Sequence, residues 1–293
     1  MTEHLLKENY RDDDKLREAY YAYIKTVFPS ADFKSWYERG YWPPEFIQYS
    51  LVKDGRVLSN VSVSKMNILL NGKTISGVQI GAVGTIPEFC RQGLSRYLME
   101  HVIEKYQKAV DLIFLFANET VIDFYPKFGF TRHDESVFIA KSDIPKPEFA
   151  ARKLEINNAG DMALVEDYLA RRQDLTVRFG ARGYDKITLW HVLNLHPERL
   201  WYVEEDGVIV IANEKEGHLH VWDVIFSRPI DLSAVLPKII KSDTIQSIRY
   251  YFAPDVVGYG FDETEIIDDS PLFTLGEFDI GDGPLKFPAT AQT

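Results

Sequence analysis

The segment from residue 83 to residue 98 constrains the fold most, because it joins a strand to an amphipathic helix through a short loop that contains a glycine. The strand stops at Pro87. Beyond the loop, apolar side chains recur at helical spacing, at Leu94, Tyr97, Leu98, Val102, Ile103 and Tyr106. The free N–H groups of a helix N-terminus carry a partial positive charge that suits a pyrophosphate, and Gly93 lets backbone approach such a group closely. The segment therefore predicts an anion site.

Two hairpins are predicted ahead of this segment. The dipeptides Asp54-Gly55 and Asn71-Gly72 each stand between two runs of strand-forming residues, which is the usual chemistry of a tight turn. Before them, apolar residues at helical spacing predict an amphipathic helix over residues 13–29, where Pro29 ends the pattern. The N-terminal half is therefore expected to open with helices and to continue as an antiparallel meander.

Three shorter elements are expected after the helix that follows the loop. Residues 110–117 form a continuous apolar run of the length of a buried strand. Residues 119–128 favour a short helix that Gly129 closes, and residues 131–139 favour a further strand. The meander is thus followed by a strand, a helix and a strand.

The length of the chain suits two domains. At 293 residues it is long for one compact domain and natural for two of roughly 150, each able to bury its own core. The run Pro145-Lys146-Pro147 interrupts the periodic pattern near the middle. We therefore predict one domain over residues 1–146 and a second over residues 147–293.

The C-terminal half repeats the layout of the first. Residues 202–210 show the same strand, Asp-Gly turn and strand as residues 50–57. A strand over 218–226, a helix over 231–241 and a strand over 246–252 follow in the same order. The repeat predicts tandem domains of the α/β (α+β) class, each a mixed, largely antiparallel sheet flanked by helices. The alternative is that two α+β domains share hairpins by chance.

Charge and hydropathy narrow the range of partners. The formal net charge is −11 and the Lys and Arg residues form no cluster, which argues against a nucleic-acid backbone as partner. The longest strongly apolar run, residues 112–117, is far shorter than the ~20 residues of a membrane-spanning helix. The N-terminal residues lack the features of a secretory signal. We expect a cytoplasmic protein that binds no nucleic acid and no membrane.

The potential metal ligands are few. Cys90 is the single cysteine, so neither an intrachain disulfide nor a cysteine-based metal cluster can form. His218 and His220 alternate on one predicted strand, but the sequence shows no third ligand beside them. No metal site is therefore expected.

A second motif follows the buried strand, about 25 residues after the loop. Its residues are Asn118, Phe124, Tyr125, Lys127, Gly129 and Phe130. Together with the loop, this motif closely resembles the GNAT superfamily of N-acetyltransferases. The order of residues around the loop is similar to the enhanced intracellular survival type of that superfamily, in which a second, non-catalytic copy of the fold follows the active one.

The chain departs from the family pattern at two positions of the loop. Cys90 stands where the family usually has Arg or Gln, and Ser95 stands where it has Gly or Ala. Since the phosphate contacts are mainly backbone N–H groups, a changed side chain at position 90 need not abolish binding, and Arg91 could supply charge. We expect the anion site to be retained, with a reduced affinity for its ligand.

The resemblance implies acetyl-CoA as co-substrate and assigns residues to it. The pantetheine is expected to pair with the strand backbone at Val83, Gly84 and Thr85. The remaining cofactor contacts are expected at Arg91, Gln92, Gly93, Leu94, Ser95 and Asn118. The C-terminal half lacks both motifs, so the second domain is expected to be a degenerate copy without a CoA site.

The resemblance also implies two catalytic roles. A backbone N–H near Gly84 or Thr85 would face the thioester carbonyl, and such a donor is typically worth ~3 kcal/mol. Tyr125 would act as the general acid that protonates the departing CoA thiolate. The sequence does not identify a general base.

The acceptor is expected to be a primary amine of a small molecule or a peptide, acetylated by direct attack in a ternary complex. Trp36, Tyr37 and Trp42 belong to an aromatic cluster that would line the substrate cavity or pack in the core. Two other functions stay open: a non-catalytic acyl-CoA-binding module for regulation or interaction, and a transferase for a longer acyl or an aminoacyl group. A homo-oligomer is compatible with the sequence.

Overall fold

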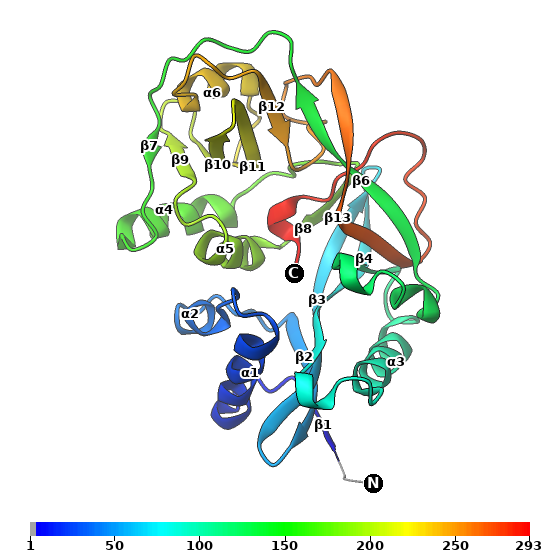
Figure 1. The fold of residues 1–293 in the computed structure, drawn as a ribbon. Coiled ribbons are helices and arrows are strands. Elements are labelled where there is room, and N and C mark those ends of the chain that lie inside the picture. The colour runs from blue at the N-terminus through cyan, green and yellow to red at the C-terminus, as the bar shows by residue number, and fades with distance from the viewer. Residues whose placement is uncertain (1–3) are drawn as a thin grey trace.

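The computed structural model describes residues 4–293, apart from the side chains at positions 268 and 269. In the N-terminal half, two helices are followed by a meander of long strands, and a strand–helix–strand unit comes next (Figure 1). The elements are β1 (Leu5–Glu8), α1 (Asp14–Val27), α2 (Phe33–Glu38), β2 (Phe46–Lys53), β3 (Arg56–Leu70), β4 (Lys73–Thr85), α3 (Leu94–Tyr106), β5 (Leu112–Phe116) and β6 (Thr131–Ala140). This order confirms the predicted meander and the helix after the loop.

Helix α1 shows how local sequence fixes an element. Its N-cap, Asp13, accepts hydrogen bonds from the N–H groups of Lys15 and Leu16 at 3.0 and 3.1 Å. Tyr20 and Tyr23 lie on its buried face, and the helix stops at Val27, two residues before Pro29. The predicted helix is confirmed, slightly shortened at both ends.

The strands form one continuous sheet, in the order β1-β2-β3-β4-β5-β13-β6-β12-β11-β10-β9-β7, and β8 pairs with β3 off this path. Most neighbouring pairs are antiparallel, but β4 and β5 are parallel, with Gly77 opposite Leu112 and Ile80 opposite Leu115. Helix α3 connects these two strands, as a parallel pair requires. Helices α1 and α2 lie on one side of the meander and α3 on the other (Figure 1). The mixed α/β class with a large, mainly antiparallel sheet is confirmed.

The C-terminal half contains a second strand–helix–strand unit. Strand β11 (His218–Phe226) and β12 (Ser247–Tyr250) are parallel and are joined by α6 (Leu232–Ile239), as β4 and β5 are joined by α3. The other elements of this half are β7 (Arg152–Lys153), α4 (Ala159–Ala170), β8 (Phe179–Arg182), α5 (Asp185–Asn194), β9 (Leu200–Val203), β10 (Val208–Lys215) and β13 (Glu263–Gly276). The predicted order of strand, helix and strand in this half is confirmed.

The two halves exchange strands. Strand β13, from the C-terminal half, pairs with β5 through Leu272 and Phe116. Strand β6, from the N-terminal half, pairs with β12 through Ala140 and Ile248. The boundary near residue 146 stays a prediction, but in the folded chain the sheet runs across it.

The prediction of a short helix over residues 119–128 is wrong. Two separate 3₁₀ turns occupy this stretch, Glu119–Val121 and Tyr125–Phe128. The first is capped by the side chain of Asn118, which accepts from the N–H of Thr120. Pro126 has no N–H to donate, so the second turn does not extend the first as an α-helix.

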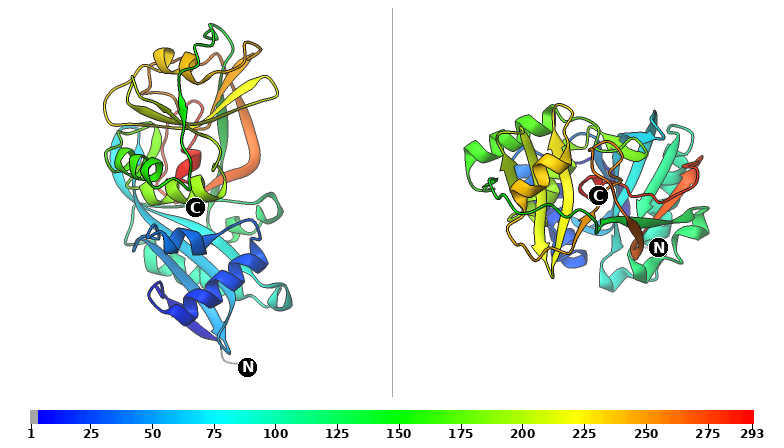
Figure 2. Two further views of the ribbon diagram at one scale, coloured as in Figure 1. Left: turned by 90° about the vertical axis from the view of Figure 1, so that its left-hand side faces the viewer. Right: turned by 90° about the horizontal axis from the view of Figure 1, so that it is seen from above.

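The halves also share a hydrophobic core. One cluster of buried side chains joins Tyr20 and Trp36 of the first half to Val165 and Leu189 of the second. The views in Figure 2 show the halves packed against each other with the C-terminal segment between them. Within residues 4–293, none of the helices combines the length and the apolar character that crossing a membrane requires.

Candidate active site

Strand β4 carries a bulge near its C-terminal end. Gly81 pairs with Ser62 and Gly84 pairs with Asn60, so that Ala82 and Val83 together stand opposite the single residue between Ser62 and Asn60. Ala82 has a φ of 47° and its carbonyl accepts a hydrogen bond of 3.0 Å from Asn60 Nδ2. A bulge of this kind takes one residue out of the strand ladder and bends the strand locally.

The strands β4 and β5 separate next to this bulge. Their pairing ends at Ile80 and Leu115, although β4 continues to Thr85. Over the described chain, no strand pairs with residues 81–85 on the β5 side. This edge of β4 is therefore not covered by a strand, although the carbonyls of Ala82 and Gly84 accept hydrogen bonds from the side chains of Asn60 and Ser59.

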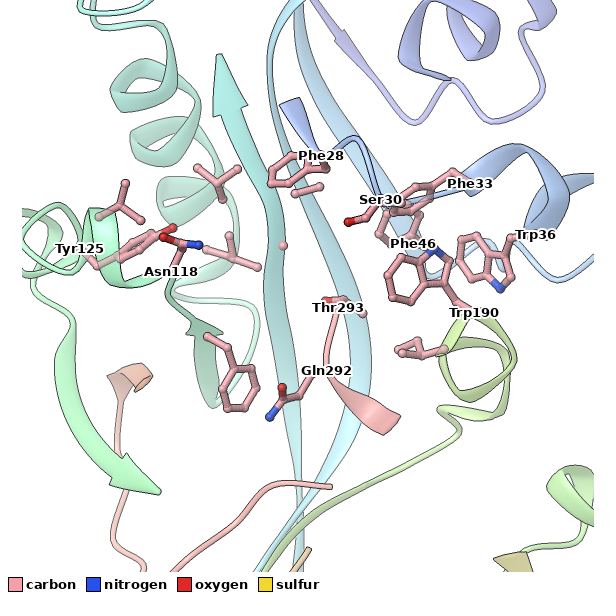
Figure 3. Close-up of a pocket in the computed structure, with 18 residues that line it drawn as sticks. Phe28, Ser30, Phe33, Trp36, Phe46, Asn118, Tyr125, Trp190, Gln292 and Thr293 are labelled. Atoms are coloured by element: carbon pink, nitrogen blue, oxygen red, sulfur yellow. The ribbon is translucent and has the colours of Figure 1, made fainter. Parts of the chain in front are cut away.

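A cavity of about 330 Å³ opens at the bulge. Ala82, Val83, Asn118 and Tyr125 are among the residues that line it. In Figure 3, Tyr125 and Asn118 lie on one side of β4, and the rings of four aromatic residues gather on the other side. The cavity thus has two arms that meet at the bulge.

Tyr125 is held in place by other rings. It is 5% exposed, and its ring centroid lies 5.6 Å from that of Phe273 and 6.3 Å from that of Phe130. Its hydroxyl makes no hydrogen bond to any described residue. The Tyr125 side chain is part of the cavity lining. Burial raises the pKa of Tyr125 to about 12, so the phenol stays protonated at neutral pH and can donate a hydrogen bond.

The loop before α3 has the backbone geometry that an anion site needs. Gly93 is the N-cap of α3, with a φ of 81°, and no side chain of the described residues caps the helix. Arg91 also has a positive φ, 63°, and its side chain is exposed. The first N–H groups of α3 are therefore available to a ligand, with Arg91, Gln92 and Gly93 at the surface beside them.

Ser95, one of the two departures from the family pattern, turns inward. Its Oγ lies 2.6 Å from Thr85 Oγ1 and 3.3 Å from Ser59 Oγ. Ser59 Oγ in turn donates to the carbonyl of Gly84 at 2.8 Å. These hydroxyls tie the start of α3 to the end of β4, so the serine does not obstruct the exposed side of the loop.

The other predicted cofactor residues divide between the cavity and its surroundings. Val83 and Asn118 line the cavity. Gly84 lies beside the bulge and packs closely against α1, while Leu94 is buried under the loop. Cys90, the other departure, is exposed, and its Sγ donates to the carbonyl of Thr85 at 3.5 Å.

The three predicted substrate residues have different surroundings. Trp36 lines the cavity. Trp42 is buried behind it, with its ring centroid 5.7 Å from that of Trp36. Tyr37 lies outside the cavity lining, under the guanidinium of Arg17 at 3.9 Å.

The structure adds residues that the sequence did not suggest. Trp190 of α5 lines the cavity beside Trp36, and Gln292 and Thr293 line it near the bulge. Trp36 Nε1 donates to the carbonyl of Lys186 in α5 at 2.8 Å, which connects the two halves at the cavity wall. No local pattern marks these residues, because only tertiary packing brings them to β4.

The C-terminal segment is anchored along β4. Gln79 Nε2 donates to the carbonyl of Ala291 at 3.0 Å, and Gln79 Oε1 accepts from the N–H of Thr293 at 2.5 Å. The buried His191 hydrogen-bonds the carbonyl of Gln292 through Nε2 at 2.7 Å. These contacts fix the position of Gln292 and Thr293 at the cavity.

Comparison with known proteins agrees with this geometry. Residues 12–132, which include β4, the loop, β5 and the Tyr125 motif, match the family model described as Acetyltransferase (GNAT) domain. This part of the chain is a GNAT acetyltransferase domain. The resemblance seen in the two sequence motifs is thereby confirmed. No curated protein matches the chain.

Solved structures show that a wider fold is shared. A protein of Enterococcus faecalis V583 described as a probable N-acyltransferase matches with a TM-score of 0.60 and 15% identity, over 92% of this chain and 72% of its own. A GCN5-related N-acetyltransferase of Kribbella flavida matches with a TM-score of 0.52 and 16% identity, over 92% and 71%. Eis1 of Mycobacterium abscessus matches with a TM-score of 0.50 and 11% identity, over 92% and 73%. At these identities the similarity is one of fold, and it extends beyond the GNAT domain into the C-terminal half.

Proposed function

We propose that the GNAT domain transfers an acetyl group from acetyl-CoA to a primary amine of a small molecule or peptide, by direct attack in a ternary complex. The observation that carries the proposal is the meeting of three features at one cavity. These features are the bulge at Ala82 and Val83, the parting of β4 from β5, and the hydroxyl of Tyr125.

The residues present fit acetyl-CoA. The unpaired edge of β4 over residues 81–85 suits a pantetheine arm, whose amides can hydrogen-bond to strand backbone. The uncapped N-terminus of α3 and the exposed Arg91 suit the pyrophosphate, because both favour negative charge. The distance between these features along the chain is short, so one elongated ligand can reach both.

The chemistry needs a donor at the carbonyl and a donor at the sulfur. In the transfer, the amine nitrogen bonds to the acetyl carbon, the carbon–sulfur bond breaks, the nitrogen loses one proton and the sulfur gains one. A backbone N–H of the bulge would hydrogen-bond to the carbonyl oxygen as negative charge develops there, an effect worth ~3 kcal/mol. Tyr125 would hydrogen-bond to the leaving sulfur.

The pKa of Tyr125 bears on how it acts. At about 12 it lies above the ~8.5 of an ordinary thiol, so complete proton transfer from the phenol to a thiolate is uphill. We infer that Tyr125 stabilises the developing thiolate mainly as a hydrogen-bond donor. This role requires only that the phenol remain protonated, and burial ensures that.

We propose that the C-terminal half has no CoA site of its own. Helix α6 occupies the position that α3 has in the first half, but Asp231 caps it by accepting from the N–H of Ser233 at 2.9 Å. A carboxylate at that N-terminus occupies a backbone N–H group that an anion would bind, and its charge repels the anion. The contribution of this half to the active site is instead Trp190, Gln292 and Thr293.

The test is isothermal titration of the protein with acetyl-CoA, in the wild type and in Gly93→Glu. We expect saturable binding that the substitution abolishes. Gly72→Glu is the matched control, because Gly72 also has a positive φ, 75°, and open space around it, but lies in the β3–β4 turn. Absence of binding to the wild type up to millimolar acetyl-CoA would refute the proposal.

A further inference from the structure

Strand β3 carries polar side chains at positions where the sheet is fully buried. Asn60 and Ser62 are both 0% exposed. They lie on the face of the sheet that α1 covers, since the hydroxyl of Tyr20 in α1 hydrogen-bonds Ser62 Oγ at 3.3 Å. Burying an amide or a hydroxyl costs free energy unless it is hydrogen-bonded, whereas an apolar side chain at the same position would stabilise the core. Polar residues here therefore indicate a task other than packing.

The side chain of Asn60 is held in one orientation by its partners. Its Oδ1 accepts from Ser50 Oγ at 2.8 Å. Its Nδ2 donates to Ser62 Oγ and to the carbonyl of Ala82, both at 3.0 Å. Tyr10 lies 2.6 Å from Ser50 Oγ and donates to it, because the hydroxyl proton of Ser50 is already given to Asn60. A carbonyl can only accept, so the NH₂ group of the amide must face Ala82.

The backbone at Ala82 has a conformation that alanine rarely adopts. Its φ is 47°, and this region is strained for a residue that has a side chain. Such strain persists only where the surrounding structure imposes it, and it is concentrated at functional sites. The amide of Asn60 and the hydroxyl of Tyr23 both donate to the Ala82 carbonyl, at 3.0 and 3.4 Å. These two donors fix the direction of the peptide unit between Ala82 and Val83.

That direction also sets where the N–H of Val83 points. The described peptide bonds are trans, and in a trans peptide the C=O and the N–H point in opposite directions. The Ala82 carbonyl points toward Asn60 and α1, so the N–H of Val83 points to the other side of β4. Tyr125 lies on that side, across β4 from the rings of α2 (Figure 3), and α2 is on the same side of the sheet as α1 (Figure 1). Val83 itself lines the cavity.

A second peptide of β4 is held in the opposite direction. The carbonyl of Gly84 accepts from Ser59 Oγ at 2.8 Å. Ser59 lies on the α3 face of β3, because successive side chains of a strand alternate and its hydroxyl reaches the start of α3. The N–H of Thr85 therefore points toward α1 and away from Tyr125. Of the two peptides that β3 holds, the one that presents its N–H to the side of Tyr125 is that of Val83.

We propose that Asn60 is a positioning residue, which aims the N–H of Val83 at the thioester carbonyl of bound acetyl-CoA. This inference rests on the proposed function and deepens it, because it names the donor of the bulge and the side chain that directs it. The sequence motifs favour a donor near Gly84 or Thr85, one or two residues further along β4. Asn60 is not among the described residues that line the cavity, so it acts through the peptide between Ala82 and Val83.

The first experiment observes the N–H of Val83 directly in the wild-type protein. The protein is labelled with ¹⁵N-valine, the Val83 resonance is assigned through Val83→Ile, and acetyl-CoA is compared with S-ethyl-CoA, which lacks the thioester carbonyl. We expect acetyl-CoA to move the Val83 amide proton downfield relative to S-ethyl-CoA, because a hydrogen bond to the carbonyl deshields that proton. Identical Val83 shifts with the two ligands would overturn the inference.

The second experiment removes the amide of Asn60. Asn60→Leu has a similar shape but no donor, so the Ala82 carbonyl loses this bond. We expect kcat to fall about 10- to 100-fold while KM for acetyl-CoA changes less than about threefold, as expected for a donor that acts in the transition state. In titration calorimetry, the wild type should bind acetyl-CoA about 3- to 10-fold more tightly than S-ethyl-CoA, and the variant should lose this difference without binding S-ethyl-CoA more weakly. An unchanged kcat, or an equal loss of affinity for both ligands, would count against the inference.

Tyr10→Phe is the matched control. It removes a hydroxyl from the far end of the same buried network and leaves the bond from Asn60 to Ala82 in place. Urea denaturation should show a loss of stability in both variants, but only Asn60→Leu should lower kcat. A similar fall of kcat in Tyr10→Phe would contradict the specific role of Asn60. If circular dichroism shows that Asn60→Leu does not fold, the Val83 resonance of the wild type still decides.

The two proposals fail in different ways. If the Val83 resonance responds to the thioester carbonyl but no amine is acetylated, the donor is assigned correctly and the transferase function is wrong. If amines are acetylated but Asn60→Leu keeps the kcat of the wild type, the transferase function stands and the inference about Asn60 is wrong. If the wild type does not bind acetyl-CoA, both proposals are wrong.

Discussion

Tyr23 of α1 lies over Gly84 of β4 so closely that a β-carbon on Gly84 would stand 2.8 Å from the tyrosine oxygen. The same β-carbon would stand 2.7 Å from Val27 Cγ1. Tyr23 also donates to the carbonyl of Ala82 at 3.4 Å. The glycine thus lets α1 pack directly on the strand that carries the bulge.

We expect Gly84→Ala to destabilise the protein by about 1–3 kcal/mol, because α1 or β4 must shift to admit the methyl group. Gly260→Ala is the control, since no atom lies within 4 Å of its β-carbon position, and it should stay within about 0.5 kcal/mol of the wild type. Urea denaturation measures both. Restoration of stability by Val27→Ala in the Gly84→Ala background would identify the contact responsible; equal stability of the two glycine variants would contradict the packing role.

We expect Tyr125→Phe to slow turnover by ~10² to 10⁴ and to leave acetyl-CoA affinity nearly unchanged, because only the hydroxyl is lost. With a pKa of about 12, the phenol does not ionise between pH 7 and pH 10, so the ratio of the two rates should be flat over that range. Release of CoA thiol measures the rates. Tyr259→Phe, in the C-terminal half, is the control. A change below threefold would mean that Tyr125 only packs against its neighbours.

The ion pair of Lys286 and Glu135 is buried, with 4% and 0% of the two side chains exposed. Glu135 also accepts from the N–H of Phe287 at 2.7 Å, so the pair anchors the segment that leads to the cavity. Lys286→Met should cost about 3–5 kcal/mol, because it removes one partner of a buried ion pair.

The control for this pair is the exposed pair of Arg171 and Asp167, each 55% exposed. Arg171→Ala should cost less than about 1 kcal/mol in the same urea denaturation. Similar losses in the two variants would show that burial does not set the contribution of the Lys286 pair.

Stability should fall as the pH drops from about 6.5 to about 4, because burial lowers the pKa of His191 to about 4. In this range the unfolded chain binds a proton at His191 and the folded chain does not, so acid favours unfolding. The contribution of neutral His191 to the free energy of unfolding is fully present above pH 6.5. Protonation of His191 in the unfolded chain lowers that free energy by about 3 kcal/mol by pH 4.

His191→Gln tests this assignment. The variant should be less stable at pH 7.5 but should show a shallower decline than the wild type between pH 6.5 and pH 4. Urea denaturation at several pH values gives both slopes. Parallel declines would assign the acid sensitivity to other groups.

Local sequence was sufficient for the elements around the cofactor site. The periodicity after Gly93 predicted α3, and the apolar run over residues 110–117 predicted β5. The hairpin dipeptides likewise predicted the meander. These elements follow from short-range patterns of side chains, and such patterns are present in the sequence itself. The short helix after β5 was predicted incorrectly because a proline and a side-chain cap outweighed helical spacing.

The fold class, the order of strand, loop and helix, and the Tyr125 motif could all be predicted from the sequence, since each depends on residues close together in the chain. The position of β13 between β5 and β6, and the presence of Trp190 and Thr293 at the cavity, became evident only in the folded chain. These arrangements depend on pairing between distant segments, which leaves no local pattern. The bulge at Ala82 belongs with them, because its positive φ is imposed by the strands around it and not by the alanine.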